Sequence, residues 1–199
     1  MPVWLAVLIV VAVVVVVALV VWRAMASRRT QKLQERFGAE YDRTANEIGS
    51  RRQAESELAA REERRQQLNI RPLPSEARRR YVDQWQGVQA QFVDAPAAAV
   101  AAADGLVSSV MGDRGYPMDD FEQRAADVSV DHPQVVENYR AAHAISTRAA
   151  GGDATTEDLR QAMQHYRALF EELLEGGADA DGARAAARAD VREPERARR

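Results

Sequence analysis

The feature that most constrains this chain is a run of twenty consecutive apolar residues near its amino terminus, from Val3 to Trp22. As an α-helix such a run is about 30 Å long, which matches the hydrocarbon core of a bilayer. Trp4 and Trp22 lie at its two ends, as in the aromatic belts of membrane proteins. The pattern predicts a transmembrane anchor over residues 1–23, with both tryptophans at the membrane interface and the lipid bilayer as a partner.

The basic residues follow the apolar run and do not precede it. Arg23, Arg28 and Arg29 come directly after it, and no Lys or Arg stands before it. The positive-inside rule therefore places the amino terminus outside and the bulk of the chain in the cytoplasm. We expect a single-pass protein of the plasma membrane, with these three arginines at the membrane interface.

A cleaved secretory signal is the alternative interpretation of the same segment. Ala24-Met25-Ala26 offers a small-x-small cleavage site, and the protein would then be exported to the envelope and released after cleavage near Ala26. Three features favour the anchor: no basic residue precedes the run, the run exceeds the 7–15 residues typical of a signal, and Arg23 lies between the run and the cleavage site. Amino-terminal sequencing or the intact mass of the mature protein distinguishes the two.

Beyond the apolar run, charge divides the chain into parts. Residues 23–80 carry 15 basic and 9 acidic residues, whereas residues 81–175 carry 6 basic and 16 acidic ones, a net charge of −10. The near balance of the whole chain, at −3, is thus a cancellation. We predict a charged helical stalk over residues 24–71, an acidic domain over residues 72–175 and a disordered tail over residues 176–199.

The stalk is rich in Arg, Glu, Gln and Ala, which favour helix. Leu33, Phe37 and Tyr41 form a short heptad-like seam that fades further along the chain, and Gly38 and Gly49 weaken it. We predict a long, exposed charged helix with weak self-association, in preference to a stable coiled coil.

The acidic domain shows helical periodicity throughout. Tyr81, Trp85, Val88 and Phe92, for example, follow one another at spacings of three and four residues. Helix starts are predicted at Ser75, Asp94, Asp119 or Asp120, Asp131 and Thr155, the last with Asp158 in a variant of the capping box. Nothing alternates with a period of two, so the fold class is all-α, with a small bundle of four longer helices and one short one.

Two parts of the sequence carry a family resemblance. The stretches are Arg36-Phe37-Gly38-Ala39-Glu40-Tyr41-Asp42-Arg43 and residues 71–166, above all Arg114-Gly115-Tyr116-Pro117-Met118-Asp119-Asp120-Phe121. They resemble a family of uncharacterised single-pass membrane or secreted proteins of high-GC Gram-positive bacteria. The resemblance covers more than half of the chain and implies no particular activity.

Catalytic chemistry finds little support in the residues. The chain has no cysteine, no serine in a G-x-S-x-G frame and no glycine-rich phosphate loop after a strand. His132 and His143 are eleven residues apart, not at the i,i+4 spacing of a shared metal. We predict no catalytic site, no cofactor and no metal, and a domain at −10 disfavours nucleic acid as a partner.

The segment from Arg114 to Pro133 is where a protein partner fits best. It concentrates polar and aromatic residues around short, irregular structure, and exposed loops on a rigid scaffold commonly bind partners. The predicted partner surface consists of Arg114, Tyr116, Asp119, Asp120, Arg124, Asp127, Asp131 and His132. The sequence thus favours a membrane-anchored, non-enzymatic interaction or scaffold protein that presents an acidic helical domain to an unidentified protein.

Overall fold

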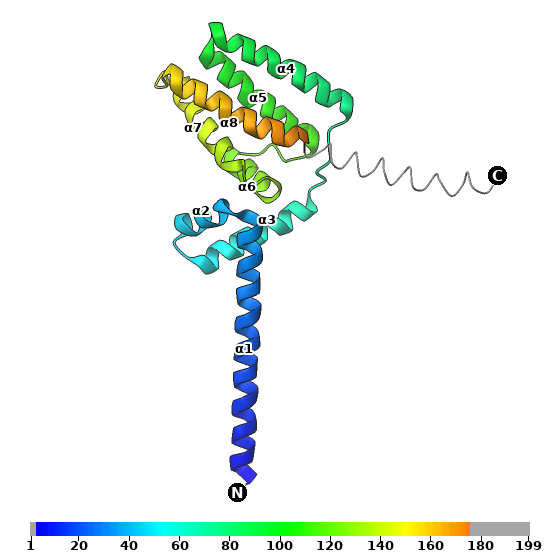
Figure 1. Cartoon of the computed structure of the whole chain (residues 1–199), viewed down its shortest axis with the longest axis vertical. Helices are drawn as coiled ribbons and strands as arrows, with labels where there is room; N and C mark the ends of the chain where they lie inside the picture. Colours follow the sequence, from blue (N-terminus) through cyan, green and yellow to red (C-terminus); the bar gives the residue numbers. More distant parts are fainter. Residues whose placement is uncertain (1–2, 176–199) are drawn as a thin grey trace, which may run out of the picture. The chain divides into compact units, whose positions relative to one another are not determined.

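The chain is all-helical in the computed structural model, which describes residues 3–175 but not most of the side chains before Ser27 (Figure 1). No strand occurs within residues 3–175, so the all-α part of the predicted fold class is confirmed. The helices are α1 (Val3–Phe37), α2 (Ala39–Ile48), α3 (Arg51–Gln67), α4 (Ser75–Asp94), α5 (Pro96–Arg114), α6 (Phe121–Asp131), α7 (Val136–Ala150) and α8 (Thr156–Glu175).

The chain divides into two compact units, residues 1–60 and residues 61–199. The division falls within α3, whereas the sequence led us to expect a domain to begin at residue 72. The predicted tail, residues 176–199, lies outside the described residues, whereas the proposed cleavage point at Ala26 lies within α1.

Within the first unit, the predicted single stalk helix is wrong, because the chain forms separate helices there. The breaks fall at Gly38 and Gly49. Gly49 ends α2 in the left-handed conformation at φ +70°, and its N–H donates to the carbonyl of Ala45. Residues other than glycine adopt this conformation at a cost. Gly49, which was expected only to weaken a continuous helix, therefore ends α2.

A small apolar cluster accompanies these turns. The predicted seam residues Leu33, Phe37 and Tyr41 are buried. The Tyr41 hydroxyl donates to Glu55 at 3.0 Å, and the Thr30 hydroxyl donates to the same carboxylate oxygen at 2.7 Å. Glu55 therefore joins α1, α2 and α3, and the seam serves packing within the chain.

The side chains of the predicted membrane interface are described in part. Trp4 is exposed, as are Arg23, Arg28 and Arg29, while the side chain of Trp22 lies outside the described part of the chain. Within the part of the chain that the structure describes, no helix combines the length and the apolar character needed to cross a membrane.

The second unit contains the predicted bundle, with four longer helices and the short α6. Two of its predicted caps are confirmed. Asp120 accepts a hydrogen bond from the Gln123 N–H at 2.9 Å, and Thr155 and Asp158 exchange side-chain to backbone bonds at 2.9 and 3.1 Å. These reciprocal bonds satisfy N–H groups that a helix start leaves without partners.

Three other predicted caps are wrong. Ser75 is the first residue of α4 and does not precede it, since Pro74 occupies the cap position. Asp94 and Asp131 are the last residues of α4 and α6, and the following helices begin at Pro96 and Val136. The preceding helix in each case continues up to the aspartate, which leaves that residue no freedom to cap the next helix.

The link between α3 and α4 returns to the end of α5. The Arg71 N–H donates to the carbonyl of Arg114 at 2.8 Å. Gly115 follows at φ +97°, and a Cβ added there would lie 2.5 Å from the carbonyl oxygen of Asn69. Only glycine allows both this backbone conformation and this close approach.

The core of the second unit is built around α5, which packs against α4, α7 and α8. Val100, Val107 and Met111 of α5, at spacings of seven and four residues, are fully buried. Trp85 from α4 stacks on Phe170 from α8, with ring centroids 4.7 Å apart. The predicted apolar faces therefore meet in one core.

Candidate functional site

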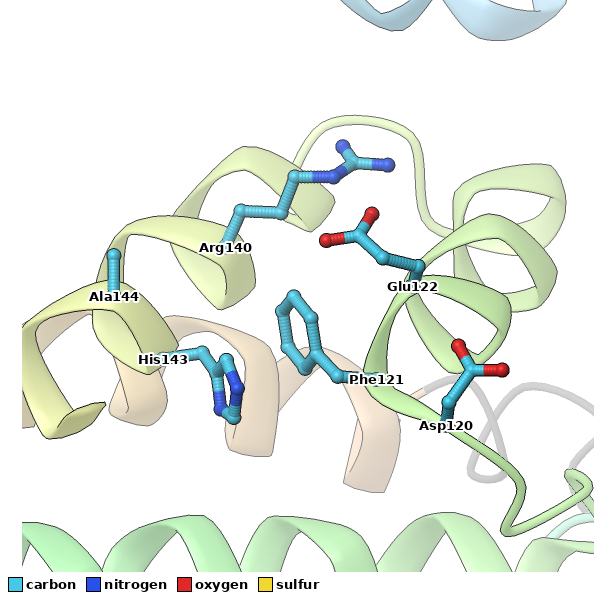
Figure 2. Close-up of a pocket in the computed structure, with 6 residues that line it drawn as sticks. All are labelled: Asp120, Phe121, Glu122, Arg140, His143 and Ala144. Atoms are coloured by element: carbon cyan, nitrogen blue, oxygen red, sulfur yellow. The ribbon is translucent and has the colours of Figure 1, made fainter.

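A surface pocket lies between the start of α6 and the middle of α7 (Figure 2). It has a volume of about 450 Å³ and is lined by Asp120, Phe121, Glu122, Arg140, His143 and Ala144. Figure 2 shows the Phe121 and His143 rings side by side, with the carboxylates of Asp120 and Glu122 on the α6 side and Arg140 on the α7 side. We call this the α6–α7 pocket.

The aromatic part of the pocket is held firmly. Phe121 is half-buried and stacks on His143, with ring centroids 3.7 Å apart and planes inclined by 8°. Its ring also meets that of Tyr139 at 4.8 Å in a tilted arrangement. Phe121 is thus fixed between two α7 side chains and gives the pocket a rigid apolar surface.

The acidic part follows from the start of α6. Asp119, Asp120 and Glu122 are all exposed, and Asp120 is oriented by its capping bond to α6. Arg140 is the one cation of the lining, and the carboxylate of Glu137 lies 2.9 Å from its guanidinium. Because that pair offsets the cation, the carboxylates dominate the charge of the pocket.

Behind the pocket, Asp104 accepts a hydrogen bond from Tyr166 and lies near His143. The Tyr166 hydroxyl donates to Asp104 Oδ1 at 2.7 Å, and His143 Nδ1 lies 3.7 Å from the same oxygen. Burial, and then the neighbouring Asp104 carboxylate, raises the pKa of Tyr166 well above its usual value. The hydroxyl therefore stays protonated, and His143 is positioned by packing more than by a hydrogen bond.

The three histidines have separate partners. His165 Nδ1 lies 3.0 Å from Asn138 Oδ1, and His132 Nδ1 lies 3.0 Å from Glu172 Oε1. Within the described residues, no group of three or more His, Cys, Asp or Glu side chains is placed to hold a metal ion.

Half of the predicted partner surface is in fact buried, and the interpretation of those residues as exposed is wrong. Arg114, Tyr116 and His132 are at most 5% exposed. The Arg114 guanidinium donates to the Leu173 carbonyl at 2.8 Å and lies 3.4 Å from His132 Nε2. Because the last carbonyls of a helix lack partners within it, Arg114 completes the end of α8.

The two acidic residues further along α6 are also engaged within the second unit. Asp127 is fully buried, with its Oδ1 3.8 Å from Arg64, and Asp131 pairs with Arg65 and accepts from the Tyr116 hydroxyl at 2.9 Å. Burial raises the pKa of Asp127. The interpretation of these residues as partner contacts overlooked the basic end of α3.

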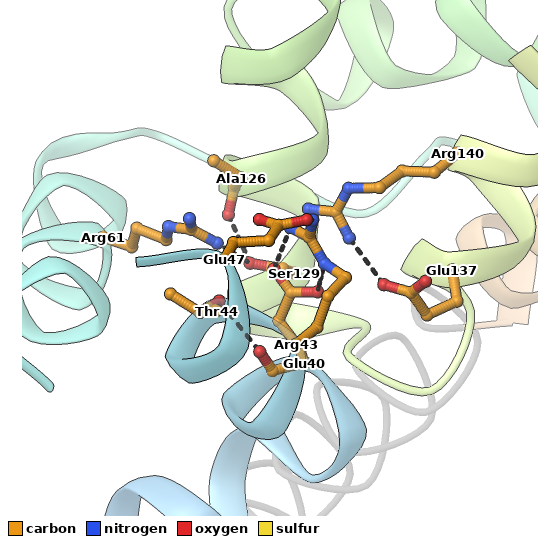
Figure 3. A network of polar contacts seen from close by, with 9 residues as sticks. All are labelled: Glu40, Arg43, Thr44, Glu47, Arg61, Ala126, Ser129, Glu137 and Arg140. Atoms are coloured by element: carbon orange, nitrogen blue, oxygen red, sulfur yellow. Dashed lines mark hydrogen bonds and ion pairs between the residues drawn. The ribbon is translucent and has the colours of Figure 1, made fainter. Parts of the chain in front are cut away.

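Arg61, also from this end of α3, reaches α6 as well. Its guanidinium lies 3.5 Å from the Ser129 hydroxyl, which donates to the carbonyl of Ala126 at 2.6 Å (Figure 3).

Asp119, Asp120 and Arg124 remain from the predicted surface. The sequence did not lead us to the α7 side of the pocket, which consists of Arg140, His143 and Ala144. The one signal in the sequence is that His143 and Ala144 follow Arg140 by three and four residues, which places all three on one face of a helix.

The fold and this pocket define the class of protein: an all-α protein with a bundle that carries an acidic surface pocket. Comparisons with protein families, with curated proteins and with solved structures find no match to the chain.

Proposed function

We propose that this chain is a membrane-anchored, non-enzymatic interaction protein whose second unit binds a basic segment of a protein partner. The observation that carries the proposal is the α6–α7 pocket, where the exposed carboxylates of Asp120 and Glu122 flank the fixed ring of Phe121. An Arg or Lys side chain fits this combination, because its aliphatic stem packs on the ring while its charged head reaches the carboxylates.

The membrane part of the proposal is supported by the sequence. The apolar run from Val3 to Trp22 has the length of a bilayer core, and the arginines that follow it favour a cytoplasmic second unit. The resemblance to single-pass membrane proteins agrees with this proposal. If instead the chain is cleaved near Ala26, the pocket would meet its partner in the envelope.

Crosslinking in the cell that makes the protein tests the binding site. A photoreactive amino acid at Ala144, an exposed position of the pocket, is expected to crosslink to a basic segment of one protein, while the same group at exposed Ser109 on α5 does not. Identical products at both positions would refute the site.

Charge removal makes the test specific. Asp120→Asn with Glu122→Gln removes both carboxylates while Asn still caps α6. Charge-assisted hydrogen bonds contribute about 1.5–3 kcal/mol, so the crosslinking yield should fall about tenfold or more. The matched control, Glu76→Gln with Asp83→Asn on exposed positions of α4, should leave the yield unchanged.

The anchor is tested separately by fractionation and mass. We expect the intact chain, with residues 3–22 retained, in the membrane fraction after a carbonate wash. A mature protein that begins near residue 27 would refute the anchor and leave the binding proposal standing.

A further inference from the structure

A second surface depression, between α4 and α8, differs in chemistry from the α6–α7 pocket. It has a volume of about 180 Å³, and its floor is formed by Trp85 and Phe92 from α4 and Met163 from α8. Both helices pack against α5, which lies beneath them. We call this depression the α4–α8 groove.

The floor is apolar and anchored in the core. Trp85 is 6% exposed and stacks on Phe170, while Phe92 and Met163 are half-buried and pack against the same core. Aromatic side chains in such a setting are typical binding anchors, and Met adapts its shape to different ligands.

The rim carries two arginines, each paired with a glutamate of its own helix. Arg160 and Arg167 line the groove from α8, and their side chains are about half exposed, at 51% and 57%. They are seven residues apart, so two helical turns, about 10 Å, separate them on one face. The remaining polar lining consists of Gln89 and Gln164, and no acidic side chain contributes.

The two arginines are held only by exposed partners on their own helix. Glu157 pairs with Arg160 at 2.6 Å and Glu171 with Arg167 at 2.7 Å. Exposed pairs contribute roughly 0–1 kcal/mol each, and Arg160, which holds both oxygens of Glu157 at 2.8 and 2.6 Å, makes the stronger of the two. Carboxylates of another molecule can therefore take their place.

From these contacts we infer that the α4–α8 groove binds an acidic amphipathic helix of a partner protein. Aliphatic side chains of that helix pack on Trp85, Phe92 and Met163, and two of its carboxylates, seven residues apart, meet Arg160 and Arg167. The inference goes beyond the proposed function, because this site selects an acidic segment whereas the α6–α7 pocket selects a basic one.

Fluorescence polarisation on the full chain in a neutral detergent tests the inference. The probe is a labelled 18-residue helical peptide with Leu at positions 4, 8 and 11 and Glu at positions 1, 5, 12 and 15. A matched peptide carries Lys in place of every Glu. In the Asp120→Asn with Glu122→Gln variant, whose α6–α7 pocket has lost both carboxylates, we expect the Glu peptide to bind at least about tenfold more tightly than the Lys peptide, with an affinity that falls as salt is raised.

Variants assign the binding to the groove. Arg160→Gln with Arg167→Gln should weaken the Glu peptide about tenfold, and Met163→Ala should weaken both peptides. Arg148→Gln, at an exposed arginine of α7, should change neither affinity. Asp120→Asn with Glu122→Gln should leave the affinity of the Glu peptide unchanged, which separates this test from that of the proposed function.

Other outcomes overturn the inference. Equal affinity for the two peptides in the Asp120→Asn with Glu122→Gln variant, no binding of the Glu peptide, or binding that survives the double arginine substitution would each do so. Tighter binding after removal of residues 176–199 would assign the groove to the chain's own tail, and loss of binding as the protein dimerises in sedimentation would assign it to a second copy.

Discussion

Replacing Arg114 by Met tests how the second unit is held together at the end of α8. The guanidinium donates to the Leu173 carbonyl and faces His132 Nε2, and both acceptors are buried. A buried acceptor that loses its donor costs about 1–3 kcal/mol, and Met preserves the aliphatic packing, so we expect a loss of about 2–5 kcal/mol. Urea unfolding of the full chain measures this loss, and an unchanged midpoint would refute the role of Arg114.

The same substitution makes a sharper prediction about protonation. Burial lowers the pKa of His132, the Arg114 charge lowers it further, and the hydrogen bond to Glu172 opposes both. Arg114→Met should therefore raise the pKa of His132, whereas Glu172→Gln should lower it. Titration of the imidazole signals by NMR, assigned with His132→Gln, measures both shifts.

Opposite signs are the essential result. Two shifts in the same direction would show that His132 responds to general loosening and not to the two neighbours in contact with it. The geometry agrees with a neutral ring. The Arg114 guanidinium can only donate, so Nε2 accepts from it, and Nδ1 carries the proton that is donated to Glu172.

The lowered pKa of His132 also sets a pH dependence of stability. The unfolded chain takes up its proton near the ordinary value of about 6.5, above the pKa in the folded state. The stability contribution is therefore fully present above pH 6.5 and is lost as the pH falls through the folded pKa. We expect Tm to fall from pH 7.5 to pH 5, less steeply in His132→Gln, and an unaltered slope in that variant would contradict the assignment.

Three further substitutions, each compared with a control substitution, test packing, turn and cap by urea unfolding of the full chain. Leu169→Ala, at a fully buried position, should lower the free energy of unfolding by about 2–5 kcal/mol. Val93→Ala, at a position that is 81% exposed, should change it by less than about 0.5 kcal/mol. Equal effects would show that the core faces are misassigned. Gly115→Ala should lose more than about 2 kcal/mol, because the backbone and a nearby carbonyl both oppose a Cβ, while Gly87→Ala in the exposed part of α4 should gain about 0.5–1 kcal/mol. Asp120→Ala should lose about 1 kcal/mol and Asp120→Asn almost nothing, whereas equal losses would mean that the charge matters more than the cap.

The helices of the second unit could be predicted because their signals are local. Apolar spacing gives each buried face, and Pro96 and Gly115 act at the ends of α5 through their own backbone geometry. Asp94 and Asp131 misled because an Asp-x-Pro stretch is compatible with both the end of one helix and the start of the next. Only the packing of the preceding helix decides between the two.

Only the part of the site that depends on neighbouring residues in the sequence could be predicted. Asp119 and Asp120 stand beside the helix start that they belong to, so their exposure follows from the sequence. Arg114 finds its acceptor in Leu173, 59 residues further along the chain, and no local pattern indicates such a pairing. Polar residues at helix ends therefore resemble a surface until the fold supplies their partners.

The basic end of α3 changes what the charge of the chain implies. The sequence suggested a basic stalk followed by a domain at −10, but Arg64 and Arg65 pair with carboxylates of α6, so this end belongs to the second unit. Counted from residue 61 to residue 175, the unit has 13 basic and 19 acidic residues, a net charge of −6. A smaller net charge attracts charged partners less strongly, and the carboxylates that pair with Arg64 and Arg65 add nothing to that attraction. Selection must then come from local linings, which differ in sign between the α6–α7 pocket and the α4–α8 groove.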